Sequence, residues 1–218
     1  MKPVLNSTLA VALFLMTAVP GGGQPPQDPT KEVDYFPLVD KTVWTYDAGG
    51  TLITVRVKQE EEKKDEKKVG GEMEKRYRLE TSINNMPVSS EVVAVLKEGI
   101  CRVAAADKKI NPPLCFLKLP VKKGKKWKVN STVGDEKITG EFEAGEVELA
   151  AATIPYFNKG DKDKKVKLVT VKGNGLNLNG VPIDLTYYFA PDVGMVRQVA
   201  TVAGVQVDLN LKSLEVPK

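Results

Sequence analysis

The stretch Val181-Pro182-Ile183-Asp184-Leu185-Thr186-Tyr187-Tyr188-Phe189-Ala190-Pro191-Asp192-Val193-Gly194 decides the fold class, together with the segments 195–202 and 205–211 that follow it. Apolar or aromatic residues occupy alternate positions from 181 to 189 and from 205 to 211, which is typical of strands with one buried face. Pro191 presets φ, Asp192 can bond its own backbone and Gly194 tolerates a positive φ, so the intervening residues predict a turn. The region therefore predicts three consecutive antiparallel strands.

Similar alternating segments, separated by turn residues, precede this region. We expect strands at residues 41–46, 52–58, 74–83, 88–96, 100–104, 114–120, 139–142, 146–149 and 166–172. Asn111-Pro112-Pro113 predicts a break and Gly173-Asn174-Gly175 a turn, while Ala150-Ala151-Ala152 is too short to carry a helix alone. The prediction is a mainly β protein with one domain at residues 34–218. We expect a strongly curved antiparallel sheet, a half-barrel or open barrel, of about 10–12 strands with little helix.

Residues 1–23 have the features of a secretory signal peptide. Lys2 precedes an apolar run from Leu9 to Val19, and Gly21-Gly22-Gly23 follows. The run is shorter than the roughly 17–25 residues of a membrane span. A buried N-terminal helix is the alternative. Residues 24–33 are rich in proline and are expected to form a linker. The leader predicts a secreted or periplasmic protein that is not a transmembrane protein.

Charge and residue usage restrict the chemistry that the chain can perform. It holds 32 basic and 28 acidic residues, a net charge of +4, which is too mild for a dedicated nucleic-acid binder. It has no histidine, which excludes Ser-His-Asp and Cys-His catalysis and every metal site that needs imidazole. No glycine-rich phosphate loop is present. We therefore expect no catalytic residue, no cofactor and no metal.

Carboxylates leave two weaker possibilities open. A hydrolase of the glycosidase type needs two carboxyl groups in one cleft, and Asp184 and Asp208 in the C-terminal sheet are the candidates. Both alternate with apolar residues, however, which favours positions facing solvent. Asp161 and Asp163 are too few oxygen ligands for calcium and lie among lysines.

The two cysteines, Cys101 and Cys115, each fall in an expected strand. Their separation suits neighbouring antiparallel strands, and an exported chain is compatible with a disulfide. Such a bond would contribute about 3 kcal/mol in the chain-entropy model. Two buried free thiols are the alternative, and without an imidazole neither thiol is expected to be reactive.

A lysine-rich hairpin around residues 121–129 is the candidate contact for a polyanion. Its basic residues surround one tryptophan with no acid among them, and the predicted contact set is Lys122, Lys123, Lys125, Lys126 and Trp127. An acidic polysaccharide, anionic lipid head groups or nucleic acid would suit this charge. The alternative is a solvated hairpin whose Trp127 turns into the core and whose lysines protect a sheet edge.

Three segments carry a likeness to a known family. They are Tyr35-Phe36-Pro37-Leu38 with Trp44-Thr45-Tyr46, Leu117-Lys118-Leu119-Pro120 with Gly124 and Trp127, and Tyr188-Phe189-Ala190-Pro191-Asp192-Val193-Gly194-Met195-Val196. The chain resembles secreted bacterial β-sheet proteins of unknown function, the TapB-like proteins. These are broadly similar to the lipoprotein-carrier half-barrels of the LolA and LppX type. Thr153-Ile154-Pro155-Tyr156-Phe157 departs from the Val-Pro-Ala-Gly segment of the related pattern. The resemblance implies a curved sheet and transfers no catalytic residue.

The functional expectation follows from curvature. The concave face of a strongly curved sheet must be filled by side chains, a helix or a ligand, and the sequence offers almost no helix. We expect an exported, non-enzymatic domain that acts in binding or in envelope assembly, with a small apolar molecule or an envelope protein as possible partner. One alternative is a carrier or sensor of an apolar or lipid ligand lined by Tyr187, Phe189, Val207 and Leu209. The other is the carboxylate-based hydrolase.

Overall fold

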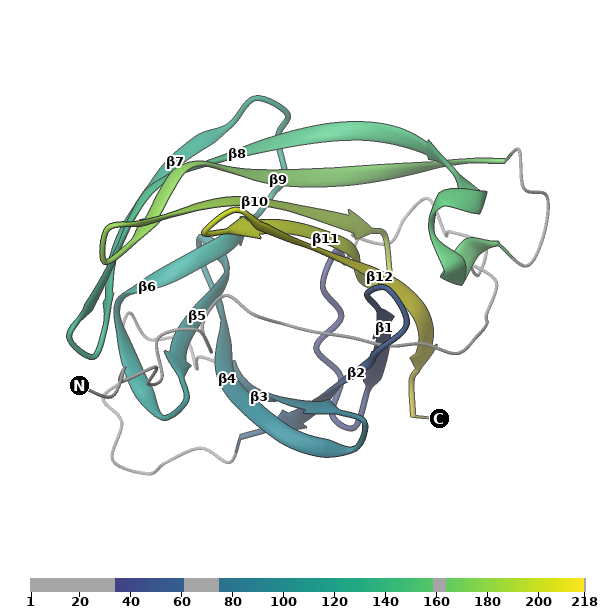
Figure 1. The fold of residues 1–218 in the computed structure, drawn as a ribbon, viewed down its shortest axis with the longest axis horizontal. Coiled ribbons are helices and arrows are strands. Elements are labelled where there is room, and N and C mark those ends of the chain that lie inside the picture. Colours follow the sequence, from purple (N-terminus) through teal and green to yellow (C-terminus); the bar gives the residue numbers. More distant parts are fainter. Residues whose placement is uncertain (1–33, 61–74, 159–163, 218) are drawn as a thin grey trace.

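The computed structural model describes residues 34–60, 75–158 and 164–217 of the 218-residue chain. The described residues form strands and two single-turn helices (Figure 1). The strands are β1 (Val43–Asp47), β2 (Leu52–Gln59), β3 (Lys75–Ile83), β4 (Met86–Leu96), β5 (Gly99–Ala105), β6 (Lys108–Lys118), β7 (Lys126–Val133), β8 (Glu136–Ala150), β9 (Lys165–Leu178), β10 (Val181–Ala190), β11 (Gly194–Val202) and β12 (Val205–Glu215). The expected leader and linker, residues 1–33, lie outside the described residues.

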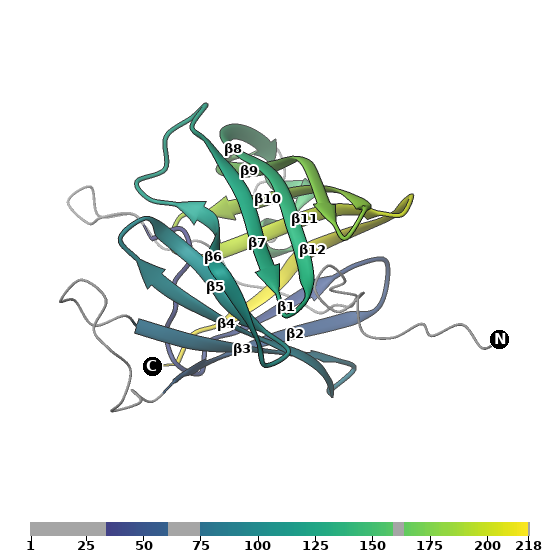
Figure 2. The ribbon, with the colours of Figure 1, turned by 90° about the vertical axis from the view of Figure 1, so that its left-hand side faces the viewer.

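The strands form a closed barrel whose strand order follows the chain. Each strand pairs antiparallel with its neighbours in sequence, and β1 also pairs with β12, from Val43 opposite Glu215 to Asp47 opposite Asn210. Figure 2 shows the strands wrapping around one interior. The mainly β, antiparallel prediction is confirmed, but the expected half-barrel or open barrel is wrong. Alternation along a strand reports one buried face and does not report whether the two sheet edges meet.

Three breaks expected from the sequence lie inside strands. β6 continues through Asn111-Pro112-Pro113, and β8 is one strand where two were expected. β9 continues through Gly173-Asn174-Gly175, where the register against both β8 and β10 shifts. These glycines therefore accommodate a bulge, a role that sequence alone does not distinguish from a turn. The turn to β10 is instead at Asn179-Gly180.

One end of the interior is packed with aromatic rings, and we call it the aromatic end: Phe36, Trp44, Phe116 and Phe189. The Phe36 ring lies 5.5 Å from that of Trp44 and 5.4 Å from that of Phe116, measured between centroids. The Trp44 indole donates a hydrogen bond of 2.8 Å to the carbonyl of Val193. Gly194 has φ +97°, and a Cβ there would lie 3.2 Å from the Trp44 nitrogen, so glycine lets the indole lie against this turn.

The connection between β8 and β9 contains the two helical turns, η2 (Ala151–Thr153) and η3 (Pro155–Phe157). Ile154 and Tyr156 are buried there, and η3 contacts β12. In the part of the chain that the structure describes, no helix has the length and apolarity to cross a bilayer.

β6 makes fewer backbone pairs with β7 than with β5. Pairing between β6 and β7 is limited to Ile110 opposite Val133 and Asn111 opposite Thr132. The Trp127 indole spans the rest of this seam by donating a hydrogen bond of 2.7 Å to the carbonyl of Cys115. On its other side, β6 is joined to β5 by the Cys101–Cys115 disulfide between directly opposed residues. β6 is thus fixed to β5 more firmly than to β7.

Candidate binding cavity in the barrel interior

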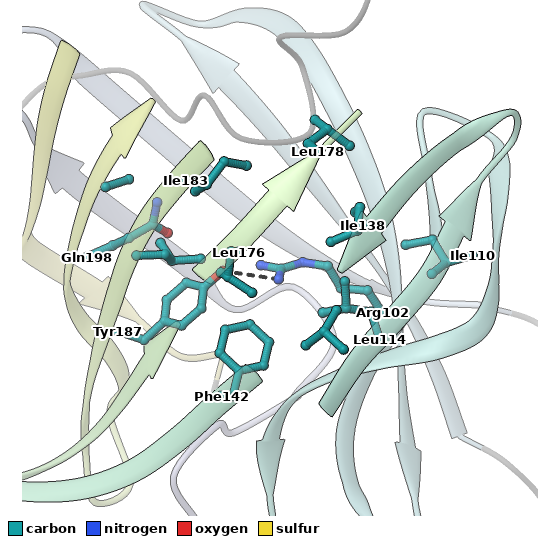
Figure 3. Close-up of a pocket in the computed structure, with 13 residues that line it drawn as sticks. Arg102, Ile110, Leu114, Ile138, Phe142, Leu176, Leu178, Ile183, Tyr187 and Gln198 are labelled. Carbon is teal, nitrogen blue, oxygen red and sulfur yellow. Dashed lines mark hydrogen bonds between the residues drawn. The ribbon is translucent and has the colours of Figure 1, made fainter. Parts of the chain in front are cut away.

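The interior opposite the aromatic end holds a cavity of about 70 Å³ (Figure 3). Most of its lining is aliphatic, and we call this part the cavity end. The lining residues are Arg102, Ile110, Leu114, Val129, Ile138, Phe142, Leu176, Leu178, Ile183, Leu185, Tyr187, Gln198 and Ala200. They come from seven consecutive strands, β5 to β11.

Strand alternation and one glycine create this space. Ile183, Leu185 and Tyr187 occupy alternate positions of β10, so all three project to the inner face. Gly173 of β9 lies opposite Leu185, and a Cβ at Gly173 would meet the Leu176 side chain at 2.2 Å. The missing side chain therefore lets Leu176 lie close to the sheet, which leaves the neighbouring volume unfilled.

A charged pair lies between the cavity end and the aromatic end. Arg102 of β5 donates from Nε to Glu91 of β4 at 2.5 Å and from Nη1 to the Tyr187 hydroxyl at 3.1 Å. The two charged side chains are only 17% and 14% exposed. The guanidinium carbon also lies 4.5 Å from the ring centroid of Phe116, a cation–π contact. Arg102 therefore closes the floor of the cavity above the aromatic end.

The surroundings keep Arg102 positively charged. Burial by itself would lower the pKa of the guanidinium. The negative charge of Glu91 and the hydroxyl of Tyr187 outweigh burial and hold that pKa above its usual value. A permanent cation next to an aliphatic cavity is a costly arrangement for packing alone, because replacing a buried ion pair by apolar residues is often neutral or stabilising.

Gln198 of β11 is the second polar group of the cavity. It is 5% exposed and lies directly between Tyr187 of β10 and Leu209 of β12 on the inner face. Its side chain lines the cavity. The amide therefore presents a hydrogen-bond donor and an acceptor to an otherwise mostly aliphatic space. Figure 3 shows Gln198 on the wall opposite Arg102.

The structure places the residues predicted to bind an apolar ligand on the inner face, but in different parts of it. Tyr187 lines the cavity. Phe189 belongs to the aromatic end, with its ring centroid 6.2 Å from that of Phe36. Val207 and Leu209 are buried on β12 and are not part of the cavity lining. Of the four predicted residues, only Tyr187 lines this cavity, and the other lining residues were not predicted.

The predicted polyanion contact is split between surface and interior. Lys122, Lys123 and Lys126 are exposed, and Lys125 is half-buried. Lys126 lies 3.4 Å from a carboxylate oxygen of Glu143. The Trp127 ring is buried, with its centroid 5.7 Å from that of Phe142. The lysines and the tryptophan consequently do not form one surface.

The candidate carboxylates lie outside the barrel. Asp184 is exposed and alternates with Ile183 and Leu185, so it projects from the outer face. Asp208 accepts a hydrogen bond of 2.9 Å from Nε of Arg197 on the adjacent strand. Asp161 and Asp163 lie outside the described residues. Within the described ranges no group of three or more His, Cys, Asp or Glu residues could hold a metal ion.

Sequence reasoning missed Arg102, Glu91 and Gln198. The sequence pattern could have identified Gln198, because it is a polar residue in the alternating apolar row of Val196, Ala200 and Val202 on β11. Arg102 did not, because the register of β5 shifts on both sides of it and its face cannot be counted from the strand ends.

No protein-family model matches the sequence, and no curated protein matches it either. Two solved structures are similar over most of the chain. A candidate lipoprotein of Parabacteroides distasonis is 11% identical, with a TM-score of 0.48 over 85% of this chain and 100% of that chain. A candidate exported protein of Bacteroides fragilis, described as having a YmcC-like fold, is 12% identical, with a TM-score of 0.50 over 84% of this chain and 100% of that chain. The likeness to TapB-like and LolA or LppX proteins stays a prediction. What the comparisons establish is a similarity of fold to the Bacteroides fragilis protein.

Proposed function

We propose that this protein is an exported, non-enzymatic binding protein that holds the apolar part of a ligand inside its barrel. The observation that carries the proposal is the mostly aliphatic cavity in the barrel interior, opposite the packed rings of the aromatic end. Interiors of folded domains are close-packed, and a void costs stability unless something fills it. Export rests on the leader-like residues 1–23. Binding in place of catalysis rests on the absence of histidine from the sequence together with the outward positions of Asp184 and Asp208.

The size of the cavity limits the ligand. A cavity of about 150 Å³ in another protein holds benzene, so about 70 Å³ accommodates a short alkyl segment without rearrangement. Exposed apolar side chains at the same end support access from an apolar environment such as a bilayer or micelle. They are Met86 and Val88 after the β3–β4 turn, Val181 after the β9–β10 turn and Val205 after the β11–β12 turn.

The test is calorimetric titration of the full chain with the straight-chain alcohols from 1-butanol to 1-decanol. Each buried methylene contributes about 0.8 kcal/mol, so affinity should rise about fourfold per carbon and then level off when the chain exceeds the cavity. Ala200→Leu fills the cavity from its wall and should abolish binding. Thr201→Leu places the same side chain on the outer face of the same strand and should leave binding unchanged. Equal binding by the wild type and Ala200→Leu would overturn the proposal.

A further inference from the structure

We propose that Arg102, Tyr187 and Gln198 form the head-group site for an anionic single-chain amphiphile, with a carboxylate or phosphate head, whose alkyl chain occupies the cavity. The inference rests on the proposed function and adds to it the charge and orientation of the ligand. The head would lie at the floor of the cavity, and the chain would extend toward Ile138, Leu178 and Ile183.

Arg102 has unused hydrogen-bonding capacity. A guanidinium carries five N–H donors in a planar fork. In this protein Nε binds Glu91 and Nη1 binds the Tyr187 hydroxyl. These two bonds use two of the five donors, and among the described residues Nη2 has no hydrogen-bond partner. Arg102 can therefore donate charge-assisted hydrogen bonds to an anion, which are about twice as strong as neutral ones.

Gln198 supports the same site independently of charge. Its side chain is 5% exposed and lines the cavity. The amide nitrogen can donate two hydrogen bonds, so a head-group oxygen next to it would gain a neutral donor in addition to the guanidinium. A purely apolar ligand would make no use of this amide.

Glu91 lowers the affinity of this site for an anion. Its carboxylate neutralises Arg102 and would repel a second anion bound to the same guanidinium. The two anions would use different edges, because Glu91 accepts from Nε and the ligand would accept from Nη1 and Nη2. Replacing Glu91 by glutamine keeps an oxygen to accept from Nε and removes the repulsion. Glu91→Gln should therefore tighten binding of an anionic ligand and leave a neutral one unaffected.

The experiment compares three eight-carbon probes, 1-octanol, octanoate and octyl phosphate, by calorimetry on the full chain at pH 8. For the wild type we expect an anionic probe to bind at least tenfold more tightly than 1-octanol, and the stronger of the two anions identifies the head group. Glu91→Gln should increase this preference about tenfold. The double variant Glu91→Gln/Arg102→Gln removes both charges of the pair, so neither is left buried without its partner. It should bind all three probes equally.

The outcomes separate this inference from the function on which it rests. Binding of 1-octanol that equals or exceeds that of both anions would overturn the head-group site and leave interior binding intact. Failure of all three probes to bind would overturn both. A preference for anions that persists in the double variant, or disappears in the surface variant Lys122→Gln, would place the anion contact on the lysine-rich loop and would also overturn the inference.

Discussion

The aromatic end and the cavity end of the barrel are built from the same antiparallel strands, yet their interiors are filled differently. At the aromatic end, large rings from four separate segments lie within about 6.5 Å of one another, and Trp44 and Tyr46 donate hydrogen bonds to the carbonyls of Val193 and Met195. At the cavity end, shorter aliphatic side chains meet the small residues Gly173 and Ala200 and leave a void. The difference indicates that the aromatic end contributes more to stability, and the cavity end is the part to which we assign the proposed binding.

Truncation should have its largest effect at the aromatic end. Trp44→Ala removes a fully buried indole, its stacking on Phe36 and its hydrogen bond to Val193, and we expect a loss of about 3–5 kcal/mol in the free energy of unfolding. Leu178→Ala at the cavity end should cost about 2 kcal/mol, the low end for such a change, because Leu178 already borders empty space. Urea denaturation measures both. An equal or larger loss for Leu178→Ala would break the comparison.

Enlargement should have a smaller effect, again differing between the ends. Ala190 is fully buried in the hydrophobic core at the end of β10 that follows Phe189, so Ala190→Leu overpacks the core there and should destabilise by about 1–3 kcal/mol. Ala200 is equally buried but faces the cavity, and Ala200→Leu should change the free energy of unfolding by less than about 1 kcal/mol in either direction. Paired denaturation curves give the difference. If the two alanines respond alike, the cavity is not a free volume in solution.

The smallest effect on stability is expected for a surface ion pair near the aromatic end, Lys118 with Glu98. It serves as an exposed counterpart to the buried Arg102–Glu91 pair. Lys118 donates a hydrogen bond of 2.6 Å to Glu98 and lowers the pKa of that carboxyl. A lowered folded pKa gives stability that is present above the ordinary glutamate value of about 4.3 and is lost as the pH falls through the folded value. Because Glu98 is 65% exposed, we expect only a few tenths of a kcal/mol.

Thermal unfolding of the wild type and Glu98→Gln as a function of pH measures this contribution. The melting temperature of the variant should be slightly lower at pH 7, and the two curves should converge near the acid limit. A gap that widens as the pH falls would have the wrong sign for this ion pair.

Local pattern predicted the hairpins but not the closure or the cavity. The alternation of residues 181–189 and the Pro191–Gly194 turn are properties of neighbouring residues, and the structure has β10, the turn and β11 at those places. Barrel closure depends on β1 meeting β12, with paired residues separated by 163 positions (Asp47 and Asn210) to 172 positions (Val43 and Glu215), which no local pattern encodes.

The site was predicted only in part, for a related reason. Tyr187 was identified from its aromatic character on an alternating strand. Its partner Arg102 lies 85 positions away and reaches it through strand bulges that move a charged residue to the inner face. Gln198 could have been identified as a polar residue in an apolar row, but its place beside the cavity is a property of the folded interior.

The pairing of β1 with β12 also makes the strand order of the barrel cyclic. Because Val43 lies opposite Glu215, the first and last strands are neighbours in the same way as any hairpin pair. A flexible linker from residue 217 to residue 34, with new termini opened at Asn179-Gly180, would preserve the pairing of all twelve strands while cutting one exposed turn. Such a circular permutant would place the chain ends at the cavity end, where a fused reporter could sense an occupied barrel.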